Sequence, residues 1–232
     1  MTSLDIAYAF TWFILFIISA TIHEAAHAWA AKMGGDLTAY AGGQVSLNPL
    51  PHIKREPWGM VVFPLVSSFA FGWPFGYAST PYNSSWAYNH PRKAAWMAAA
   101  GPLANLAIVV LCVVGVKVGI LTGVLVEPES VGFKHLVDSG VGLPGLTVII
   151  SMLFTLNLIM FVLNLLPLPP LDGSGVIALF MPDNTARSYR SIVSNPTFGF
   201  IGFFLAWQLF SPLFHIVFGV VVNLIYWPVR FG

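Results

Sequence analysis

Charged residues are scarce in this 232-residue chain. Only 8% of its residues are Asp, Glu, Lys or Arg, whereas 57% are hydrophobic. A soluble domain usually carries about 25% charged residues, so the composition excludes an ordinary water-soluble globule. Several apolar runs are long enough to cross a bilayer, for which roughly 20 residues are needed. We therefore expect an all-α polytopic membrane protein that is embedded in a lipid bilayer.

Cysteine and basic residues are also few. The single cysteine, Cys112, lies in an apolar run, so it forms no intrachain disulfide and is expected to be a small buried hydrophobic residue. The net charge of +1 and the lack of a basic patch argue against a nucleic-acid partner. The residues before the first apolar segment include no Lys or Arg, unlike a secretory signal, so we expect this segment to stay in the mature protein.

The apolar and polar segments divide the chain into one membrane-embedded unit, residues 1–232. We expect three core helices and a C-terminal span, at about residues 6–33, 94–119, 146–173 and 198–227. The connector at 36–92 is polar and irregular, and we expect short β-like pieces between its glycine and proline turns. Its apolar part, 59–77, is broken by prolines and glycines and is expected to be re-entrant.

The first helix carries three ionisable residues in the sequence HEAAH, namely His23, Glu24 and His27. Ionisable groups at membrane depth cost several kcal/mol and are rarely without a function. Residues four apart share one face of a helix, so both histidines can bind one ion, and Glu24 can touch a water on that ion. The alternative is a chance match in which the histidines only form hydrogen bonds inside the core.

A catalytic zinc ion takes three protein ligands and leaves a fourth position for water. Apart from Glu24, only Asp172 among the acidic residues has apolar neighbours; the others lie in tails or connectors, at Asp5, Asp36, Glu56, Glu127, Glu129, Asp138 and Asp183. Asp172 follows a proline-rich break, and irregular backbone at membrane depth is tolerated where it lines a cavity or is buried in protein. The alternative is that Asp172 is a helix N-cap.

Four segments together resemble the site-2 protease family of intramembrane zinc metalloproteases. They are HEAAH at 23–27, NLLPLPPLDG at 164–173, AGPLANL at 100–106 and GQVSLNPLPHI at 43–53. The second segment matches every fixed position of the family motif N-x-x-P-x-P-x-L-D-G. The last segment is similar to the connector of a compact bacterial and archaeal branch, without an inserted PDZ-like domain or an appended nucleotide-sensing domain.

The resemblance implies hydrolysis of peptide bonds in membrane-protein substrates, within or beside the bilayer. It implies one zinc ion bound by His23, His27 and Asp172, with Glu24 as the general base. His52 departs from the pattern, because Lys and Arg follow where an acidic residue is expected, so we interpret His52 as a connector residue.

Two asparagines are candidates for substrate binding, Asn105 and Asn164. They could hold an unwound substrate strand or an oxyanion, or they could only form hydrogen bonds between helices. Two other functions use the same residue types: a cation transporter or channel, and a metal-dependent hydrolase of non-peptide membrane substrates. A transporter needs a polar route to both faces, whereas the ionisable residues here gather at one depth, which favours the enzyme.

The basic residues predict the orientation. With 59–77 re-entrant, most of them share the face where the first helix ends: Lys32, Lys54, Arg55, Arg92, Lys93, Arg187 and Arg190, against Lys117, Lys134 and Arg230 on the other. The positive-inside rule makes the first face cytoplasmic. We therefore expect an external N-terminus and an active site that opens toward the cytoplasm, in the cell membrane of a prokaryote.

Overall fold

The computed structural model of the chain describes residues 2–227, and helices dominate it. Four of the helices in this range are long and apolar enough to cross a membrane: α1 (Ser3–Gly34), α6 (Pro91–Leu121), α7 (Pro144–Asn164) and α10 (Pro196–Ile225). The protein is therefore an all-α polytopic membrane protein, as predicted. The four helices match the four expected spans to within a few residues, except at the end of the third.

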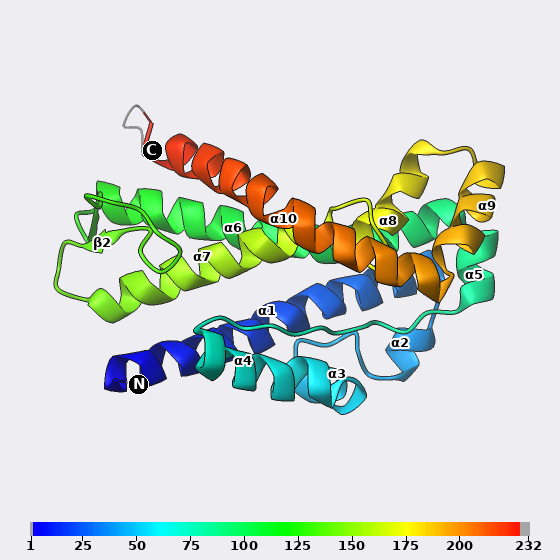
Figure 1. Cartoon of the computed structure of the whole chain (residues 1–232), viewed down its shortest axis with the longest axis horizontal. Helices are drawn as coiled ribbons and strands as arrows, with labels where there is room; N and C mark the ends of the chain where they lie inside the picture. Colours follow the sequence, from blue (N-terminus) through cyan, green and yellow to red (C-terminus); the bar gives the residue numbers. More distant parts are fainter. Residues whose placement is uncertain (1, 228–232) are drawn as a thin grey trace.

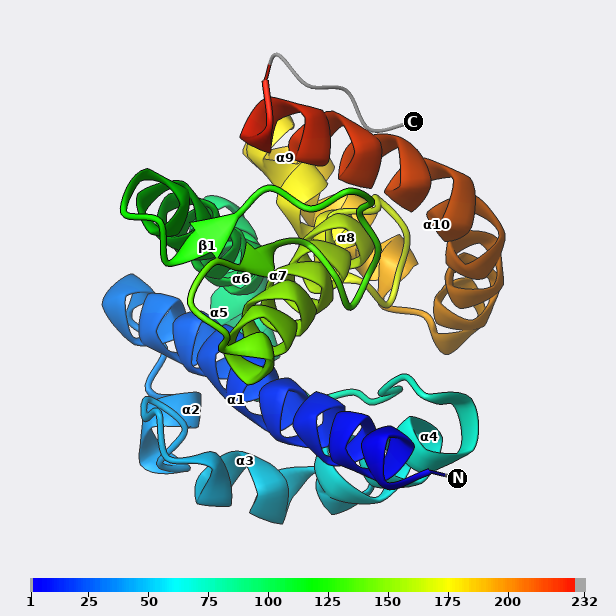
Figure 2. The ribbon, with the colours of Figure 1, turned by 90° about the vertical axis from the view of Figure 1, so that its left-hand side faces the viewer.

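Helices α1, α6 and α7 pack together as a three-helix core, and α10 lies obliquely across one side of it (Figures 1 and 2). Both α1 and α6 bury alanines, including Ala28, Ala31, Ala95 and Ala99. Small residues let two helix backbones approach closely, which is a common way to pack helices in a membrane. The ends of α1 and α7 lie on the same side of the molecule as the start of α6 (Figure 1). We call this side the Gly34 end and the opposite side the Ser3 end.

The loop between α6 and α7 lies at the Ser3 end. It contains a short antiparallel pair, β1 (Leu125–Val126) and β2 (Asp138–Ser139), with Leu125 opposite Ser139. The hydroxyl of Tyr226, just after α10, donates a hydrogen bond to the carbonyl oxygen of Leu136 at 2.6 Å. This bond ties the C-terminal end of α10 to the loop.

The connector at 36–92 contains helices, and no strand occurs among its residues, all of which the structure describes. Its elements are α2 (Thr38–Ala41), α3 (Pro49–Arg55), a π-helical turn η1 (Trp58–Val62), α4 (Phe63–Phe71) and α5 (Ser84–Asn89). The expectation of short β-like pieces was therefore wrong. Asparagine is the reason at two positions, because the side chains of Asn48 and Asn83 accept hydrogen bonds from backbone N–H groups and cap α3 and α5. The polar residues that suggested turns begin helices instead.

Within the connector, η1 and α4 run toward the Ser3 end, and residues 72–83 return as extended chain (Figure 1). The helical part, Trp58–Phe71, is shorter than the roughly 20 residues that cross a bilayer. Near its end, Phe69 packs edge-on against Phe10 of α1 with ring centroids 5.0 Å apart. The connector thus enters and leaves at the Gly34 end, as a re-entrant segment does.

Asp36 joins the two ends of the connector. Its Oδ2 accepts a hydrogen bond from the backbone N–H of Asn83 at 2.7 Å, and its Oδ1 accepts one from the backbone N–H of Thr38 at 2.9 Å. Burial acts to raise the pKa of Asp36, but a hydrogen bond from the Thr38 hydroxyl at 2.6 Å and the two from backbone N–H groups together outweigh it and hold the pKa below its usual value. Asp36 is therefore ionised at the point where it links the first residues of the connector to Asn83.

The third core helix ends earlier than predicted. Helix α7 stops at Asn164, residues 165–171 are irregular, and Asp172 begins a separate short helix, α8 (Asp172–Val176). The predicted helix at 146–173 is wrong at this end because Pro167, Pro169 and Pro170 lack N–H donors and disfavour helical backbone before them. The 3₁₀ turn η2 (Ile177–Phe180) and α9 (Asp183–Val193) then lead to α10.

Candidate metal site

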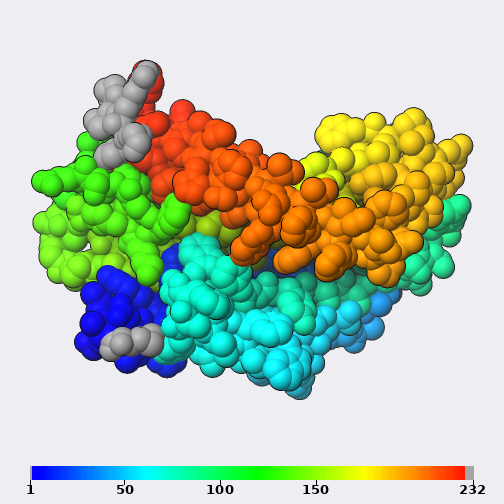
Figure 3. Space-filling model, viewed as in Figure 1, coloured from blue at the N-terminus to red at the C-terminus, as the bar shows by residue number. Residues whose placement is uncertain are grey.

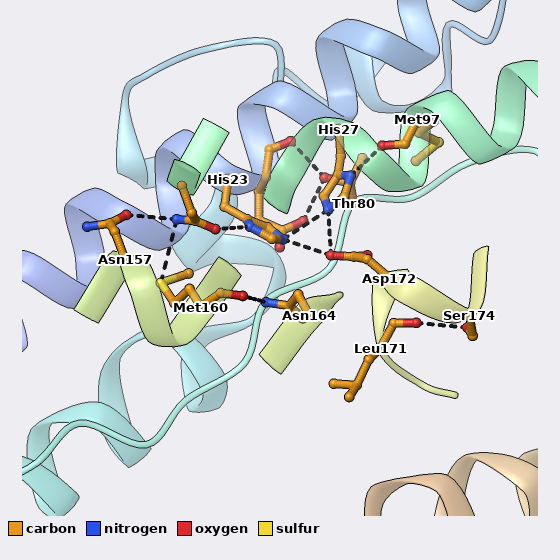
Figure 4. Close-up of polar contacts among 12 residues, drawn as sticks. His23, His27, Thr80, Met97, Asn157, Met160, Asn164, Leu171, Asp172 and Ser174 are labelled. Atoms are coloured by element: carbon orange, nitrogen blue, oxygen red, sulfur yellow. Dashed lines mark hydrogen bonds and ion pairs between the residues drawn. The ribbon is translucent and has the colours of Figure 1, made fainter. Parts of the chain in front are cut away.

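Three predicted ligands meet at the Gly34 end of the core (Figure 4). His23 and His27 lie one turn apart on α1, and Asp172 is brought to them from 149 positions after His23. Oδ2 of Asp172 lies 3.1 Å from Nε2 of His23 and 3.2 Å from Nε2 of His27, and the two Nε2 atoms are 3.0 Å apart. One nitrogen or oxygen of each residue therefore faces a common point.

The other ring nitrogens of the histidines fix their tautomers. Nδ1 of His23 lies 2.6 Å from Oδ1 of Asn105, and Nδ1 of His27 lies 2.7 Å from the carbonyl oxygen of Met97. Carbonyl oxygens only accept hydrogen bonds, so each Nδ1 is assigned the hydrogen, and each Nε2 of the neutral ring presents a lone pair. The common point is surrounded by electron-pair donors.

This donor set fits a zinc ion. Two imidazole nitrogens and a carboxylate oxygen within 3.2 Å of one another are held together either by a proton or by a cation among them, and a metal ion can contact all three at once. A tetrahedron around zinc with bonds of about 2.0–2.1 Å has edges of about 3.3 Å, close to the distances observed here. Three ligands also leave the fourth position that a catalytic zinc uses for water.

Asp172 does not cap α8. The N-cap position is occupied by Leu171, and the Asp172 carboxylate lies against the histidines. The next residue, Gly173, explains how α8 approaches so closely, because a Cβ there would collide with the carbonyl oxygens of Leu165 and Leu166. The Asp-Gly pair therefore allows the start of α8 to pack onto the end of α7.

Gly101 of α6 also lies directly against the site. A Cβ at Gly101 would collide with Nε2 of both His23 and His27. The absence of a side chain at this position lets the α6 backbone approach the histidines and leaves their Nε2 atoms unobstructed. The glycine of AGPLANL is thus part of the local architecture of the site.

Glu24 lies beside the three ligands and is 5% exposed. The hydroxyl of Thr80 lies 2.8 Å from Oε2 of Glu24 and 2.9 Å from its carbonyl oxygen. Thr80 was not among the residues singled out from the sequence, since it lies in extended chain with no motif around it. Its role depends on the fold of the connector.

The two asparagines occupy different places. Asn164, the last residue of α7, lines the groove beside the site and donates a hydrogen bond to the carbonyl oxygen of Met160 at 3.0 Å. Asn105 is fully buried behind His23 and is not part of the groove wall; of the two alternatives for this residue, the position agrees with hydrogen bonds between helices. His52 is buried in α3 and donates to the carbonyl oxygen of Ser46 at 3.0 Å, which agrees with a connector residue.

A groove of about 1470 Å³ runs past the site. His23, His27, Glu24 and Asp172 lie on its wall, and most of the remaining wall is apolar, with aromatic residues from the connector and from α10. The connector and α10 approach each other on the face shown in Figure 3, where the rings of Phe75 and Trp207 are 6.1 Å apart. The groove thus runs between the three-helix core, the connector and α10.

A model of one known protein family, Peptidase family M50, matches residues 11–207. The chain belongs to peptidase family M50. This match contains HEAAH, AGPLANL and the segment that ends in Asp172 and Gly173. The resemblance to the site-2 protease family is thereby confirmed, and the M50 family assigns the chain to the zinc metalloproteases.

Two curated proteins are similar to this M50 chain. The "Putative zinc metalloprotease YwhC" of Bacillus subtilis (strain 168) is 35% identical over 187 residues, which cover 78% of this chain and 76% of that protein. The "Putative zinc metalloprotease Rip2" of Mycolicibacterium smegmatis (strain ATCC 700084 / mc(2)155) is 29% identical over 175 residues, 74% of this chain and 58% of that protein. No solved structure matches this chain at a significant level.

Proposed function

We propose that this M50 peptidase is an intramembrane zinc endopeptidase that cleaves transmembrane or membrane-proximal segments of membrane proteins. The observation that carries the proposal is the convergence of His23, His27 and Asp172 beside Glu24, on the wall of an apolar groove. His27 lies seven residues before Gly34, so it is about 10 Å from the end of a membrane-spanning helix at 1.5 Å per residue. Chemistry at this depth acts on chain that is in, or close to, the bilayer.

In this proposal His23, His27 and Asp172 hold one zinc ion. A zinc ion held by these three residues would supply Lewis-acid chemistry, making water a better nucleophile at neutral pH and the substrate carbonyl more electrophilic. The Glu24 carboxylate accepts a proton from the attacking water and delivers it to the leaving amide nitrogen as the carbon–nitrogen bond breaks. Thr80 holds the carboxylate through its hydroxyl while the proton moves.

The groove is proposed to bind the substrate in an unwound form, because the carbonyls of an intact helix are shielded by its own hydrogen bonds. The apolar wall suits the side chains of a membrane segment. Extended chain at 74–80 follows the same wall, and an unwound strand could pair with such an edge. Asn164 lines the groove, and in this proposal it donates a hydrogen bond to that strand or to the oxyanion.

The orientation is part of the proposal. Lys32, Arg92, Lys93, Arg187 and Arg190 belong to parts of the helices at the Gly34 end, whereas Lys117 and Lys134 lie toward the Ser3 end. Lys54 and Arg55 belong to the last turn of α3, before the connector runs toward the Ser3 end. Arg230 lies outside the described residues. The positive-inside rule makes the Gly34 end cytoplasmic. The N-terminus would then be external and the site would open toward the cytoplasm of a prokaryotic cell.

The test uses purified full-length protein and a panel of single-span peptides. Glu24→Gln is expected to keep zinc, because Glu24 is not a ligand, and to lower the cleavage rate by about 10²–10⁴, as loss of a general base does. Zinc content is measured on the same samples. Cleavage by Glu24→Gln at the wild-type rate would show that the mechanism is wrong.

A further inference from the structure

A series of hydrogen bonds begins at Nδ1 of His23, the ring nitrogen that does not face Asp172. Nδ1 of His23 donates to Oδ1 of Asn105 at 2.6 Å, and Nδ2 of Asn105 donates to Oδ1 of Asn157 at 2.8 Å. Nδ2 of Asn157 in turn donates to Oγ of Ser19 at 2.9 Å. The series passes from α1 to α6, then to α7, and returns to α1.

The series closes on the helix where it began. Ser19 and His23 are four residues apart, so they lie one turn apart on the same face of α1. Ser19, Asn105 and Asn157 are each 0% exposed, and His23 is 5% exposed. Figure 4 shows His23 and Asn157 from their separate helices on either side of the linking amide. All three core helices are therefore joined next to the proposed ligands. We call the set His23, Asn105, Asn157 and Ser19 the polar ring; three hydrogen bonds and one turn of α1 close it.

The direction of every bond in the ring is set from α7. Nδ2 of Asn157 also donates to the carbonyl oxygen of Leu153 at 2.9 Å, and a backbone carbonyl only accepts, so this amide cannot be reversed without loss. Oδ1 of Asn157 must then face Asn105, which turns Nδ2 of Asn105 toward Asn157 and its Oδ1 toward His23. His23 is left with one role at Nδ1, that of a donor.

His27 offers a contrast. Its Nδ1 donates to a backbone carbonyl, that of Met97, which no side-chain substitution removes. The tautomer of His23 depends instead on three polar side chains that are buried in a membrane protein, where an unpaired polar group costs free energy. Helix packing alone would be served by any polar pair across an interface. The polar ring joins the helices, and because the donor and acceptor of each bond are fixed, it also sets which nitrogen of the candidate ligand His23 carries the hydrogen.

We propose that Asn105, Asn157 and Ser19 are positioning residues that hold His23 with hydrogen on Nδ1 and with Nε2 free for the metal ion. The proposal rests on the metal site of the proposed function. Loss of these hydrogen bonds lets the His23 imidazole rotate or adopt its other tautomer, so the affinity for zinc falls. Changes in the partners of ligand histidines typically weaken metal binding about 10–100-fold.

The experiment measures the zinc dissociation constant of the full chain in detergent, by competition with a chelator, and the absorption spectrum after loading with cobalt. Asn105→Leu is expected to weaken zinc binding by about 10–100-fold. Asn157→Leu should have a smaller effect and Ser19→Ala the smallest, because each acts one bond further from His23. Asn105→Asp keeps an acceptor for His23 at similar size but loses the donor toward Asn157, so it should retain more zinc affinity than Asn105→Leu and a cobalt spectrum closer to that of the wild type.

Two matched controls remove buried hydroxyls that are outside the ring. Thr21 on α1 and Thr155 on α7 are buried, and their hydroxyls have no hydrogen-bond partner among residues 2–227. Thr21→Val and Thr155→Val should leave the zinc affinity and the cobalt spectrum unchanged. They separate loss of the ring from general disturbance of α1 or α7.

The outcomes distinguish the ring from the metal site itself. Wild-type protein that binds zinc, together with unchanged affinity and cobalt spectrum in Asn105→Leu and Asn157→Leu, would overturn the positioning role and leave the proposed function standing. Wild-type protein that binds no zinc would overturn both. If a leucine variant fails to fold, Asn157→Ser removes the acceptor for Asn105 with less intrusion, and unchanged zinc binding in that variant would overturn the ring.

Discussion

The hydroxyl of Thr80 lies 2.8 Å from Oε2 of Glu24, although the two residues are 56 positions apart. Glu24 belongs to α1, and Thr80 belongs to the extended return of the connector. The carboxylate of the proposed general base is therefore oriented by the connector, whereas the proposed ligands are held by α1 and α8. This separation predicts that the connector affects the rate without affecting the metal.

Thr80→Val tests this separation, because valine has nearly the same shape and no hydroxyl. A hydrogen bond to a charged group is worth about 1.5–3 kcal/mol, and about 1.4 kcal/mol corresponds to tenfold in rate. We expect kcat to fall at least about tenfold while zinc content stays at the wild-type level. As a control, Thr122→Val removes a hydroxyl just after α6 that contacts only carbonyls of the last turn of that helix, and it should change neither quantity. An unchanged kcat in Thr80→Val would contradict the role assigned to Thr80.

Asp172→Ala tests the third ligand. The substitution leaves two imidazoles and removes the only carboxylate that meets them within the described residues, so zinc content should fall far below one ion per chain. Asp138→Ala is the matched control, since Asp138 is paired with His135 in the loop at the other end of the core. Metal analysis after dialysis checks both variants. Full zinc content in Asp172→Ala would remove Asp172 from the ligand set.

Gly101→Ala adds one methyl group where α6 meets the histidines. Because that Cβ would collide with Nε2 of His23 and of His27, we expect loss of zinc binding in a chain whose helices are otherwise intact. The control is Gly115→Ala in the same helix, where an added Cβ meets no atom within 4 Å. Circular dichroism and metal analysis distinguish the two effects. Equal zinc affinity in both variants would mean that the backbone approach at Gly101 is unimportant.

Cysteine labelling tests the orientation. After Cys112→Ala, single cysteines at Ser85 and Ser188 should react from the cytoplasmic side, because α5 and α9 meet at the Gly34 end, where Arg187 donates to the carbonyl oxygen of Tyr88 at 3.2 Å. A cysteine at Glu129, in the loop at the Ser3 end, should react from outside. Reaction of Ser85 and Ser188 variants from opposite sides would contradict this topology.

The length of the apolar runs predicted the membrane helices, and the spacing of HEAAH together with the resemblance to the family motif predicted the grouping of His23, His27 and Asp172. Residues four apart on a helix must share a face, and few acidic residues have apolar neighbours, so both features can be predicted from short stretches of sequence. The proline run before Asp172 also indicated the break in the chain. It did not indicate that α7 ends at Asn164, three residues before the first proline.

The contacts that surround the site could not be derived in this way. Asn157 and Ser19 are 138 positions apart, and neither belongs to the motifs that suggested the function. Thr80 is one polar residue in a polar stretch. Asn105 could hold substrate or a neighbouring helix by sequence criteria, and its position behind His23 depends on how α1 and α6 rotate against each other. Such relations arise from packing between distant segments.

The extended return of the connector has a consequence for hydration. Residues 74–83 form neither helix nor strand, yet they run past Glu24 at a level where the neighbouring helices are apolar. Some of their peptide groups are paired with protein, since the N–H of Phe75 donates to Ser67 and that of Tyr77 to the carbonyl of Gly59. Any others need either protein or a water-filled space beside them. We expect water to reach the Glu24 carboxylate along this side of the groove, because hydrolysis consumes one water molecule for every bond cut. The same stretch of chain that orients Glu24 would also keep it supplied with its second reactant.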